Sequence, residues 1–556
     1  MGRVTKLSIK NYKSIHERIE LVFPELGPLV IVGPNNTGKS NLMRALELVL
    51  GESWPGSYQP EDHDFFGRDP SNVPLEILVE VKDVLHAHKY GTTPVVAFIV
   101  RHTGGEERPY CMVLKDGAEN TFVSNDTRDQ CRSILISADR RLSYQLGYSS
   151  KYTFLSKLMR QFHQALTEDK DRVKGLKEKF EEIRDSFEGI KEFAVFTDEL
   201  QKQMDDFSRN LEYRLEVDFS AYDPSNYFRS LRVQPVQEGE VRTLEELGTG
   251  QEQVLALSFA YAYAKAFHGK AEGLVLIIEE PEAHLHPLAQ QWVSRKVHEF
   301  ASADGIQVAI TTHSPAFLSV LNLEGLVLVS KEKGATRVKQ LSREKLAEAC
   351  TKTGAKGATA DTILPFYAAA ATQEILSGFF ARKIVLVEGP TEALALPIYL
   401  ERAGLNPLKE GIAVIPVHGV GNLAKWWRFF TAYAIPTFPM FDNDAKDDTD
   451  QKKRSDLLTA LGTDGKTQAK LLNAKEWIIQ PNLSILGKNF EECFRVVFGD
   501  KYPALEKEAQ DKFGLFPERS KPLIARHVAE RVPVEVGSNA EKKLKEFVSV
   551  IGALKI

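Results

Sequence analysis

The first residues that could do chemistry form a glycine-rich loop near the start of the chain. The loop reads Gly-Pro-Asn-Asn-Thr-Gly-Lys-Ser over residues 33–40, after the apolar run 29–32 and before the helix-forming run 41–50. Backbone N–H groups of such a loop, at the start of a helix, surround phosphate groups. Lys39 would reach the outer phosphates, and Ser40 would bind Mg²⁺. We therefore predict a nucleotide site that is formed by Asn35, Asn36, Thr37, Gly38, Lys39, Ser40 and Asn41.

Two carboxylates and a histidine that could act on a bound nucleotide follow later in the chain. The apolar run 274–278 ends at Glu279 and Glu280. We expect Glu279 to hold Mg²⁺, directly or through water, and Glu280 to orient or deprotonate the attacking water. His313 follows the run Val-Ala-Ile-Thr-Thr. A lone histidine is more often structural, but this position after a strand favours contact with the γ-phosphate of ATP.

Two more histidines lie in the loop after these carboxylates. His284 and His286 belong to the sequence Pro-Glu-Ala-His-Leu-His-Pro over residues 281–287. They could bind a metal ion, but the sequence offers no evident third ligand. We therefore favour the interpretation of residues 281–287 as a loop without a metal ion.

A second set of acidic residues follows two later predicted strands. The strand Ile384–Val387 ends at Glu388, and Glu392 follows one helical turn later. A second apolar run ends at Asp442-Asn443-Asp444. Because the ends of parallel strands meet in one crevice, we expect these carboxylates to lie together and to bind Mg²⁺, Mn²⁺ or another divalent ion. A solvated acidic loop is the alternative, which we favour only for the next acids, Asp447, Asp448 and Asp450.

The whole chain has the composition of an ordinary globular protein. Its 556 residues are too many for one hydrophobic core and predict about two to four domains. The net charge of −5 argues against a general DNA coat but permits a local basic groove. Four scattered cysteines indicate a reduced, cytoplasmic compartment. The chain contains no apolar run of about eighteen residues, so we expect no membrane partner.

The order of the N-terminal motifs resembles that of ABC-type ATPases, especially those of DNA repair and chromosome maintenance. Leu247-Gly248-Thr249-Gly250-Gln251 resembles their signature loop, Leu-Ser-Gly-Gly-Gln. In that family the signature loop of one subunit closes over ATP that is bound to another subunit. The resemblance implies ATP contacts from Gly248, Thr249, Gly250 and Gln251 and a homodimer or homotetramer. Glu279 replaces the usual Asp, and Gly248-Thr249 replaces Ser-Gly in the signature loop; both departures are compatible with slow hydrolysis. Gln59 is a candidate for the family's separate glutamine loop.

The later carboxylates resemble those of the Toprim domain of topoisomerases, primases and some nucleases. Together with an ABC-type head, the passage FFARKIVLVEGPTEALALP over residues 379–397 resembles the OLD (overcoming lysogenisation defect) family of nucleases. The resemblance implies that Glu491, with Glu492, helps to bind a second metal ion. It also implies that Lys521 stabilises transition-state charge or protonates the leaving oxygen. From their residues alone, both segments could be amphipathic surface helices.

The resemblance also has implications for substrate and partners. It implies DNA as the substrate, a role in antiphage defence, and either a helicase-like partner, a retron RNA/DNA element or action alone. Lys425, Arg428, Lys446 and Lys488 could hold the DNA backbone. The adjacent Trp426 and Trp427 could stack on bases, but packing of a helix against the sheet is the favoured interpretation.

These observations predict an α/β protein. An ABC-type ATPase domain with a helical dimerisation insertion would be followed by a Toprim, Rossmann-like nuclease domain. The predicted boundaries are 1–150 and 214–345 for the ATPase domain, 151–213 for the insertion, 346–380 for a connector and 381–556 for the Toprim domain. Whether the insertion is a dimerising arm or packs on its own domain stays open.

Three functions are compatible with this arrangement. The first is an ATP-gated, metal-dependent DNA endonuclease that hydrolyses phosphodiester bonds with two metal ions. The second is a topoisomerase or primase with the same Toprim centre, although the DNA gates or extra nucleic-acid modules of such enzymes are not evident. The third is a DNA-structural ATPase, which would not require the carboxylates at 388 and 442–444. We favour the first.

Overall fold

The structure is a computed structural model, and it forms two compact units. It describes residues 2–51, 53–105, 109–137, 273–302, 306–444 and 451–555, with scattered residues between 169 and 262. One unit comprises Met1–Ala138 with Phe267–Ile556, and the other comprises Asp139–Ala266. In the latter, the short strands β9 (Val236–Gln237) and β10 (Glu240–Val241) pair antiparallel. Most of the predicted helical insertion, 151–213, lies outside the described residues.

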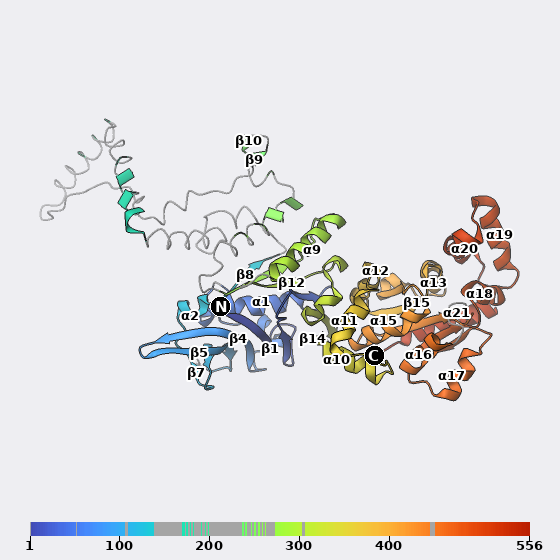
Figure 1. The fold of residues 1–556 in the computed structure, drawn as a ribbon, viewed down its shortest axis with the longest axis horizontal. Coiled ribbons are helices and arrows are strands. Elements are labelled where there is room, and N and C mark those ends of the chain that lie inside the picture. Colours follow the sequence, from blue (N-terminus) through green and yellow to red (C-terminus); the bar gives the residue numbers. More distant parts are fainter. Residues whose placement is uncertain are drawn as a thin grey trace. The chain divides into compact units, whose positions relative to one another are not determined.

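The N-terminal part of the first unit contains an antiparallel sheet (Figure 1). In β2, and in β4 after its first three buried residues, buried side chains largely alternate with more exposed ones, as expected for a sheet with one face against a core. The strands, in spatial order, are β2 (Ile19–Val22), β1 (Arg3–Lys10), β4 (Leu75–His88), β5 (Gly91–His102), β6 (Tyr110–Leu114) and β7 (Glu119–Asn120).

A second, mostly parallel sheet positions the residues that are expected to act on a nucleotide. Its strands, in spatial order, are β14 (Ala335–Gln340), β13 (Leu326–Glu332), β3 (Leu29–Val32), β12 (Ile306–Thr311), β11 (Gly273–Glu279) and β8 (Cys131–Ile136). Only β13 and β14 pair antiparallel. Because β3, β12 and β11 are parallel neighbours, the loops that follow them meet at one edge of the sheet.

Helix α1 (Lys39–Leu50) lies between the two sheets. It contacts β1 and β4 of the antiparallel sheet and β8 and β12 of the parallel sheet. Its buried residues recur at helical spacing and belong to the core that both sheets share: Leu42, Met43, Ala45, Leu46, Val49 and Leu50. The helix begins at the glycine-rich loop, so the core holds that loop at the edge of the parallel sheet. Two further helices are α2 (Asn125–Asp129) and α9 (Pro287–Ala301), which packs on β12.

Short helices connect this ATPase part to the C-terminal part. They are α10 (Arg343–Lys352), α11 (Ala360–Ala368), α12 (Gln373–Leu376) and η9 (Ser377–Phe380). The short helices η7 (Pro315–Phe317) and η8 (Val320–Gly325) belong to the N-terminal part, because they precede β13 in the chain. On one side α12 contacts η7 and α11 contacts η8. On the other side α10 contacts α15 (Val420–Ala432) of the C-terminal domain. The predicted connector is therefore largely helical and contacts both parts.

The C-terminal domain is built on a five-stranded sheet. Its strands, in spatial order, are β16 (Ile412–Pro416), β15 (Lys383–Val387), β17 (Thr437–Asp442), β19 (Leu483–Leu486) and β18 (Ile478–Gln480). All neighbours are parallel except β18 and β19. The chain passes from β15 to β16 on one side and then to β17 on the other, so the order reverses at β15. In such sheets, ligands bind at the strand ends beside this point of reversal.

Helices cover both faces of this sheet. The remaining helices of the domain are α13 (Pro390–Arg402), α14 (Pro407–Glu410), α16 (Lys452–Ala460), α17 (Gly465–Leu472), α18 (Phe490–Phe498), α19 (Lys501–Phe513), α20 (Pro517–Arg531) and α21 (Asn539–Ala553). One face shares a core with α13, α18, α20 and α21. An aromatic cluster, in which Phe379 of η9 contacts Phe429, Phe430 and Tyr433, packs α15 on the opposite face. None of the described helices has the length and apolar character of a membrane-spanning segment.

Two of the predicted DNA-contacting residues are instead structural. Lys425 is buried and its ammonium donates to the carbonyl of Phe366. Arg428 is buried and forms two hydrogen bonds with the carboxylate of Asp456, at 2.9 and 2.6 Å. The prediction for these two was wrong because helical periodicity turns them toward the connector rather than solvent. Trp426 is fully buried, as the packing interpretation expected, and Lys446 lies outside the described residues.

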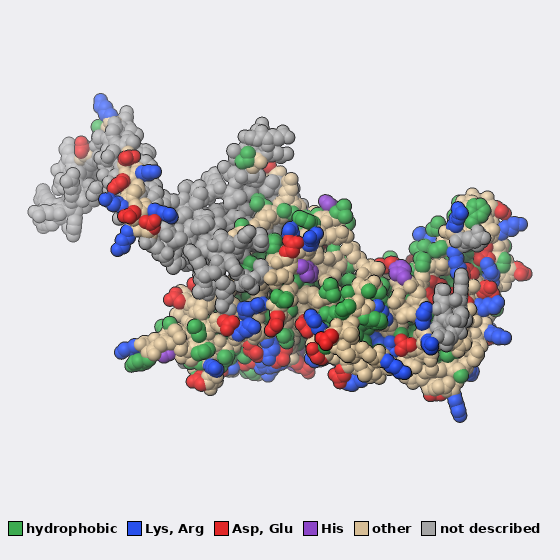
Figure 2. Space-filling view, viewed as in Figure 1, with side chains coloured by type: hydrophobic (Ala, Val, Ile, Leu, Met, Phe, Trp, Pro, Cys, Tyr) green, Lys and Arg blue, Asp and Glu red, His purple; other side chains and the backbone are tan. Residues whose placement is uncertain are grey.

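The charged surface of the described residues has mixed sign. On the face in Figure 2, Lys and Arg side chains are interspersed with Asp and Glu side chains. This pattern agrees with the small net charge of −5. Contact with a polyanion on this face would therefore depend on local clusters of basic groups.

The aromatic cluster yields a prediction about stability. Phe379 is fully buried among aromatic rings, so Phe379→Ala would leave a cavity that costs about 3–5 kcal/mol. We expect the urea midpoint of the C-terminal domain, followed by tryptophan fluorescence, to fall accordingly. Leu408→Ala, at a 91% exposed position of the same domain, is the control and should change stability by less than about 0.5 kcal/mol. Equal midpoints for the two variants would contradict this account.

Candidate functional site

The glycine-rich loop has a backbone shape that only glycine fits at two positions. Gly33 and Gly38 have φ angles of 145° and 104°, which L side chains rarely adopt. A Cβ on Gly33 would lie 2.0 Å from the carbonyl oxygen of Val329, and one on Gly38 would lie 2.3 Å from Oγ1 of Thr336. The loop therefore approaches β13 and β14 closely. Asn35, Asn36 and Ser40 are exposed at its outer side.

A chain of hydrogen-bonded polar side chains connects this loop to β14 and to the segment after β1. Asn41 Nδ2 donates to Ser14 Oγ, Ser14 Oγ lies 2.8 Å from Thr336 Oγ1, and Thr336 Oγ1 donates to the carbonyl of Thr37. If Thr336 donates onward, Ser14 must donate to Thr336, so each hydroxyl has one donor and one acceptor role. Sequence analysis missed Ser14 and Thr336 because they are 322 residues apart.

Lys39 is held at the centre of the loop. Its ammonium donates to the carbonyls of Gly33 and Pro34 at 2.9 and 3.0 Å. Burial lowers the pKa of Lys39 to about 8, while Glu280 and Glu282 oppose that shift. A desolvated ammonium beside backbone N–H groups is suited to the outer phosphates of a nucleotide.

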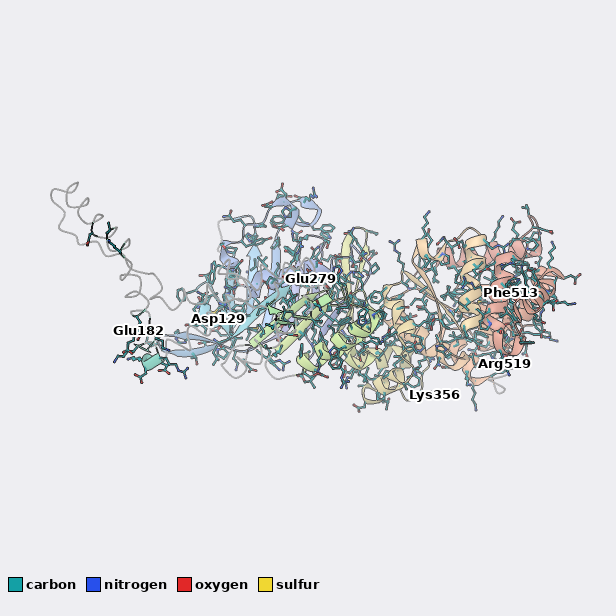
Figure 3. The ribbon with its side chains drawn as sticks, turned by 90° about the horizontal axis from the view of Figure 1, so that it is seen from above. Asp129, Glu182, Glu279, Lys356, Phe513 and Arg519 are labelled. Atoms are coloured by element: carbon teal, nitrogen blue, oxygen red, sulfur yellow. The ribbon has the colours of Figure 1, made fainter. Side chains whose placement is uncertain are left out.

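The predicted catalytic groups of the ATPase lie at the same edge of the sheet. Glu279, which Figure 3 labels, ends β11 and is 8% exposed. Glu280 has a left-handed φ of 47°, and its backbone N–H donates to the carbonyl of Thr311 on β12. Nε2 of His313 lies 3.9 Å from Oε1 of Glu280. Burial, followed by the charge of Lys39, lowers the pKa of His313 and favours its neutral form.

Glu282 is a further acidic residue of this site that sequence analysis missed. Its Oε1 accepts from the backbone N–H of His313 at 2.5 Å, and its Oε2 accepts from Thr312 Oγ1 at 2.8 Å. Burial raises the pKa of Glu282, although these hydrogen bonds oppose it. Glu282 thus fixes the loop that carries His313. Its only sequence signal was its place two residues after Glu280.

The remaining predictions for the ATPase part have mixed outcomes. Gly248 and Thr249 of the signature loop lie outside the described residues, and Gly250 and Gln251 are helical residues of the second unit. Gln59 is exposed. His286 caps α9 by accepting from the backbone N–H of Ala289, which is a structural role.

The second set of carboxylates gathers at the carboxyl ends of β15 and β17. Glu388 follows β15 and Asp442 ends β17, and these strands are parallel neighbours. The backbone N–H of Asp442 donates to Oε1 of Glu388 at 2.7 Å. Glu392, in the first turn of α13, accepts from the backbone N–H of Gly389 at 3.1 Å. The fold therefore brings the carboxylates of Glu388, Glu392 and Asp442 close together.

Electrostatic repulsion within this cluster is strong. Burial raises the pKa of Glu388 to about 7, and the charges of Glu392 and Asp444 add to the shift. Burial also raises the pKa of Glu392 to about 7, with a contribution from Glu491. The pKa of Asp442 is raised well above its ordinary value by burial and then by the surrounding carboxylates. We call Glu388, Glu392, Asp442, Asp444 and Glu491 the carboxylate cluster.

Glu491 and Lys521 join this cluster from two later helices. Glu491 of α18 is 6% exposed, and Nζ of Lys521 on α20 lies 2.9 Å from its Oε2. Oε1 of Glu491 is buried without a hydrogen-bond partner among the described residues. Burial lowers the pKa of Lys521, but Glu491, Asp442 and Glu392 outweigh it, so the pKa is raised and Lys521 is a cation. Glu492 is not brought in, because its exposed carboxylate pairs with Lys488 at 2.8 Å.

Asn443 and Arg454 fix the Asp-Asn-Asp segment, and sequence analysis missed both roles. The backbone N–H of Asn443 donates to the carbonyls of Leu486 and Lys488. Its side-chain amide donates to three further carbonyls, those of residues 471, 472 and 474. Arg454, only 1% exposed, donates to the amide oxygen of Asn443, and its charge lowers the pKa of Glu388. Asn443 is therefore an anchor between the two aspartates.

The donor chemistry of the cluster fits divalent cations. Hard oxygen ligands are those that Mg²⁺ and Mn²⁺ prefer, and a cation would relieve the repulsion among buried carboxylates. The buried Oε1 of Glu491 is an acceptor that a cation would satisfy. Within the described ranges, no group of three His, Cys, Asp or Glu side chains is already arranged to hold a metal ion. Glu388 and Glu392 each use one carboxylate oxygen to accept from a backbone N–H group.

Comparison with known proteins finds a match for the N-terminal part, for the start of the C-terminal part and for most of the chain. The family model described as AAA ATPase domain matches residues 3–90 and 77–318. The model described as Overcoming lysogenization defect protein-like, TOPRIM domain matches residues 379–444. The OLD nuclease of Thermus scotoductus is 28% identical over 515 residues, which cover 87% of this chain and 92% of that protein.

Two further matches cover a smaller share of this chain. Structural maintenance of chromosomes protein 1 of Caenorhabditis elegans is 28% identical over 214 residues, 38% of this chain and 15% of that protein. The solved Smc head domain from Pyrococcus furiosus is 16% identical with a TM-score of 0.38 and covers 63% of this chain and 99% of that chain. The two domain matches and the alignment along most of both chains lead to one conclusion: the chain belongs to the OLD family, in which an AAA ATPase domain is followed by an OLD-like TOPRIM domain.

Proposed function

We propose that the chain is an ATP-gated, divalent-metal-dependent DNA endonuclease. The observation that carries this proposal is the carboxylate cluster, with the cation Lys521 beside it. A protein that only clamps DNA would gain nothing from five crowded carboxylates, whose repulsion destabilises the fold. A relative along most of this chain is named an OLD nuclease, which also favours phosphodiester hydrolysis.

The residues of the cluster have separable roles in this reaction. Bound Mg²⁺ or Mn²⁺ would activate the attacking water and stabilise the leaving 3′ oxygen. Glu388, Asp442 and Asp444 would hold one ion, and Glu491 with Glu392 would help to hold the second. Lys521, which pairs with Glu491, would stabilise negative charge on the phosphate or protonate the leaving oxygen. Asn443 would keep the two aspartates in position through its five hydrogen bonds to backbone carbonyls.

Contacts between the two domains support control by ATP. The ring of His313, at the predicted γ-phosphate position, lies 6.5 Å from the ring of Phe380. Phe380 ends η9, which leads into β15, and β15 ends before Glu388. A movement of His313 with nucleotide state would therefore reach Phe380 and the strand that carries Glu388. ATP would set the geometry for cutting and would not supply the energy for DNA hydrolysis.

Finer aspects of this function follow from the family resemblance. We propose a homodimer or homotetramer, in which the signature loop of one copy contacts ATP on another. A role in antiphage defence, a cytoplasmic location, and a helicase-like or retron partner stay predictions. Whether DNA is nicked or cut in both strands also stays a prediction.

The first prediction concerns the nuclease centre. Asp442→Ala removes the carboxylate that the end of β17 contributes to the cluster. We therefore expect the rate of DNA cutting to fall by at least about 10²-fold. ATP binding, measured by fluorescent-nucleotide titration, should not change because the nucleotide loop lies in the other domain. Asp500→Asn, at an exposed position of the same domain, is the matched control. Normal cutting by Asp442→Ala would exclude this site.

The second prediction concerns pH. Glu388 and Glu392 have pKa values raised to about 7, so below that pH an incoming cation must displace protons. Without metal, these two carboxyl groups lose their protons at a higher pH in the folded chain than in the unfolded chain. The free energy of unfolding therefore falls as the pH rises from the ordinary pKa of a glutamate to about 7. We therefore expect Mn²⁺ to raise the unfolding temperature more at about pH 8 than at about pH 6, with nucleotide absent. Asp442→Asn should reduce that difference, and an equal Mn²⁺ effect at both pH values would refute the cation site.

The third prediction concerns the link between the domains. Lys39→Ala should remove the effect of ATP on cutting, because Lys39 is the predicted phosphate ligand. Phe380→Ala should bring the ratio of cutting rates with and without ATP close to one, while ATP hydrolysis continues. Phe366→Ala, an exposed ring on the same connector, should preserve the ratio. A normal ATP response in Phe380→Ala would exclude this route of coupling.

A further inference from the structure

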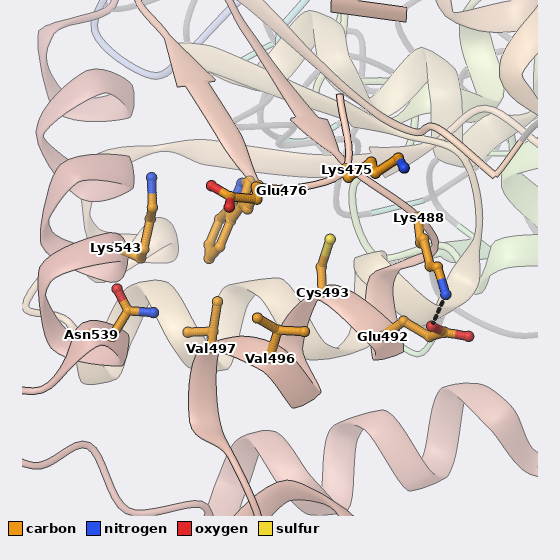
Figure 4. Close-up of a pocket in the computed structure, with 10 residues that line it drawn as sticks. Lys475, Glu476, Lys488, Glu492, Cys493, Val496, Val497, Asn539 and Lys543 are labelled. Carbon is orange, nitrogen blue, oxygen red and sulfur yellow. Dashed lines mark hydrogen bonds and ion pairs between the residues drawn. The ribbon is translucent and has the colours of Figure 1, made fainter. Parts of the chain in front are cut away.

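A cavity of about 290 Å³ opens along the outer side of α18 in the C-terminal domain (Figure 4). It is enclosed by the segment before β18, the segment between β19 and α18, the outer side of α18 and the start of α21. The backbone packs closely next to two of the lining residues, since a Cβ on Gly487 would lie 2.0 Å from the carbonyl carbon of Lys475. Glycine at 487 thus lets the chain segments that carry Lys475 and Lys488 approach each other.

The cavity combines a basic rim with an apolar wall. Lys475, Lys488 and Lys543 contribute ammonium groups, and they outnumber the two glutamates of the lining, Glu476 and Glu492. Lys475 forms no ion pair with any residue of the described ranges. Lys488 pairs with Glu492, as Figure 4 shows, and Lys543 pairs with Glu546 outside the cavity.

The apolar wall is formed by Trp477, Val496 and Val497. The indole N–H of Trp477 donates inward to Ser484 Oγ at 2.8 Å, so its polar atom is already satisfied within the domain. Val496 is 79% exposed although it lies on a helix that packs into the core. An exposed valine beside lysines suits a ligand with one flat apolar part and one anionic part.

The cavity adjoins the proposed cutting site. The carbonyl of Lys488 accepts from the backbone N–H of Asn443, between the two aspartates. Glu491 of the cluster and Glu492 of the cavity are consecutive residues of α18. The N-terminus of α21, a 15-residue helix, also lines the cavity through Asn539 and favours anionic groups.

We propose that this cavity binds one nucleotide of the DNA strand next to the cleaved phosphodiester. A backbone phosphate would lie between Lys475 and Lys488, and the base would pack against Val496 and the edge of Trp477. The volume admits a single nucleoside unit and not a duplex. This proposal rests on the proposed function and adds a subsite that would influence where the strand is cut.

The test uses full-length variants and a short DNA duplex. Lys475→Ala removes the unpaired ammonium, and Val496→Trp fills the cavity from an exposed position, so both variants should fold. We expect each to raise the KM for DNA cutting about 3- to 10-fold and to change the distribution of cut positions, with a smaller effect on kcat. Lys542→Ala, an exposed neighbour on α21 that does not line the cavity, is the matched control and should match the unmodified chain.

Binding measurements separate this proposal from the proposed function. In an Asp442→Ala background, fluorescence anisotropy should show weaker DNA binding for Lys475→Ala and Val496→Trp than for Lys542→Ala. If the unmodified chain binds DNA but never cuts it, the proposed nuclease function is contradicted. The comparison of binding affinities still tests the cavity in that case. Unchanged affinity and unchanged cut positions in both cavity variants, or no DNA binding by the unmodified chain, would overturn the proposal.

Discussion

Repulsion among buried carboxylates at the end of β15 and β17 is the constraint on which the C-terminal domain depends. Burial and mutual charge raise the pKa values of Glu388, Glu392 and Asp442, so the fold holds these groups together against their electrostatic preference. The parallel sheet, the first turn of α13 and the helix α18 supply the rigidity for this. Lys521 offsets part of the negative charge, and a divalent cation would offset more.

The ATPase part also holds a charged group away from water, but there the group is a cation. A desolvated ammonium, that of Lys39, lies in a loop that two glycines shape and a chain of polar side chains supports. Both sites occupy the carboxyl ends of parallel strands, where loops rather than strands determine the chemistry. The helical connector contacts both parts, and its last residue, Phe380, lies between His313 and the strand that leads to Glu388. The fold thus provides a short physical route between nucleotide and carboxylates.

Local patterns in the sequence sufficed to predict the strand ends and the phosphate loop. Glu388, Asp442 and Gly33 each lie at the end of an apolar run that marks a strand, so their positions followed from neighbours in the chain. Residues that act across the fold were missed, because Thr336 and Ser14 or Arg454 and Asn443 meet only after folding. Lys425 and Arg428 were misassigned for a related reason. A basic residue on a helix can face solvent or a buried acceptor, and only the packing of α15 against the connector and α16 decides between them.

The central claim is that the carboxylate cluster binds divalent cations for phosphodiester cleavage. Its most direct test is a crystal structure of the full chain with Mn²⁺ and a DNA oligonucleotide, in which anomalous scattering locates the metal. The account predicts anomalous peaks within coordination distance of Glu388, Asp442 and Glu491, next to a phosphate of the DNA. Bound DNA with no anomalous peak at these carboxylates, or a peak only beside Ser40 and Glu279, would contradict it.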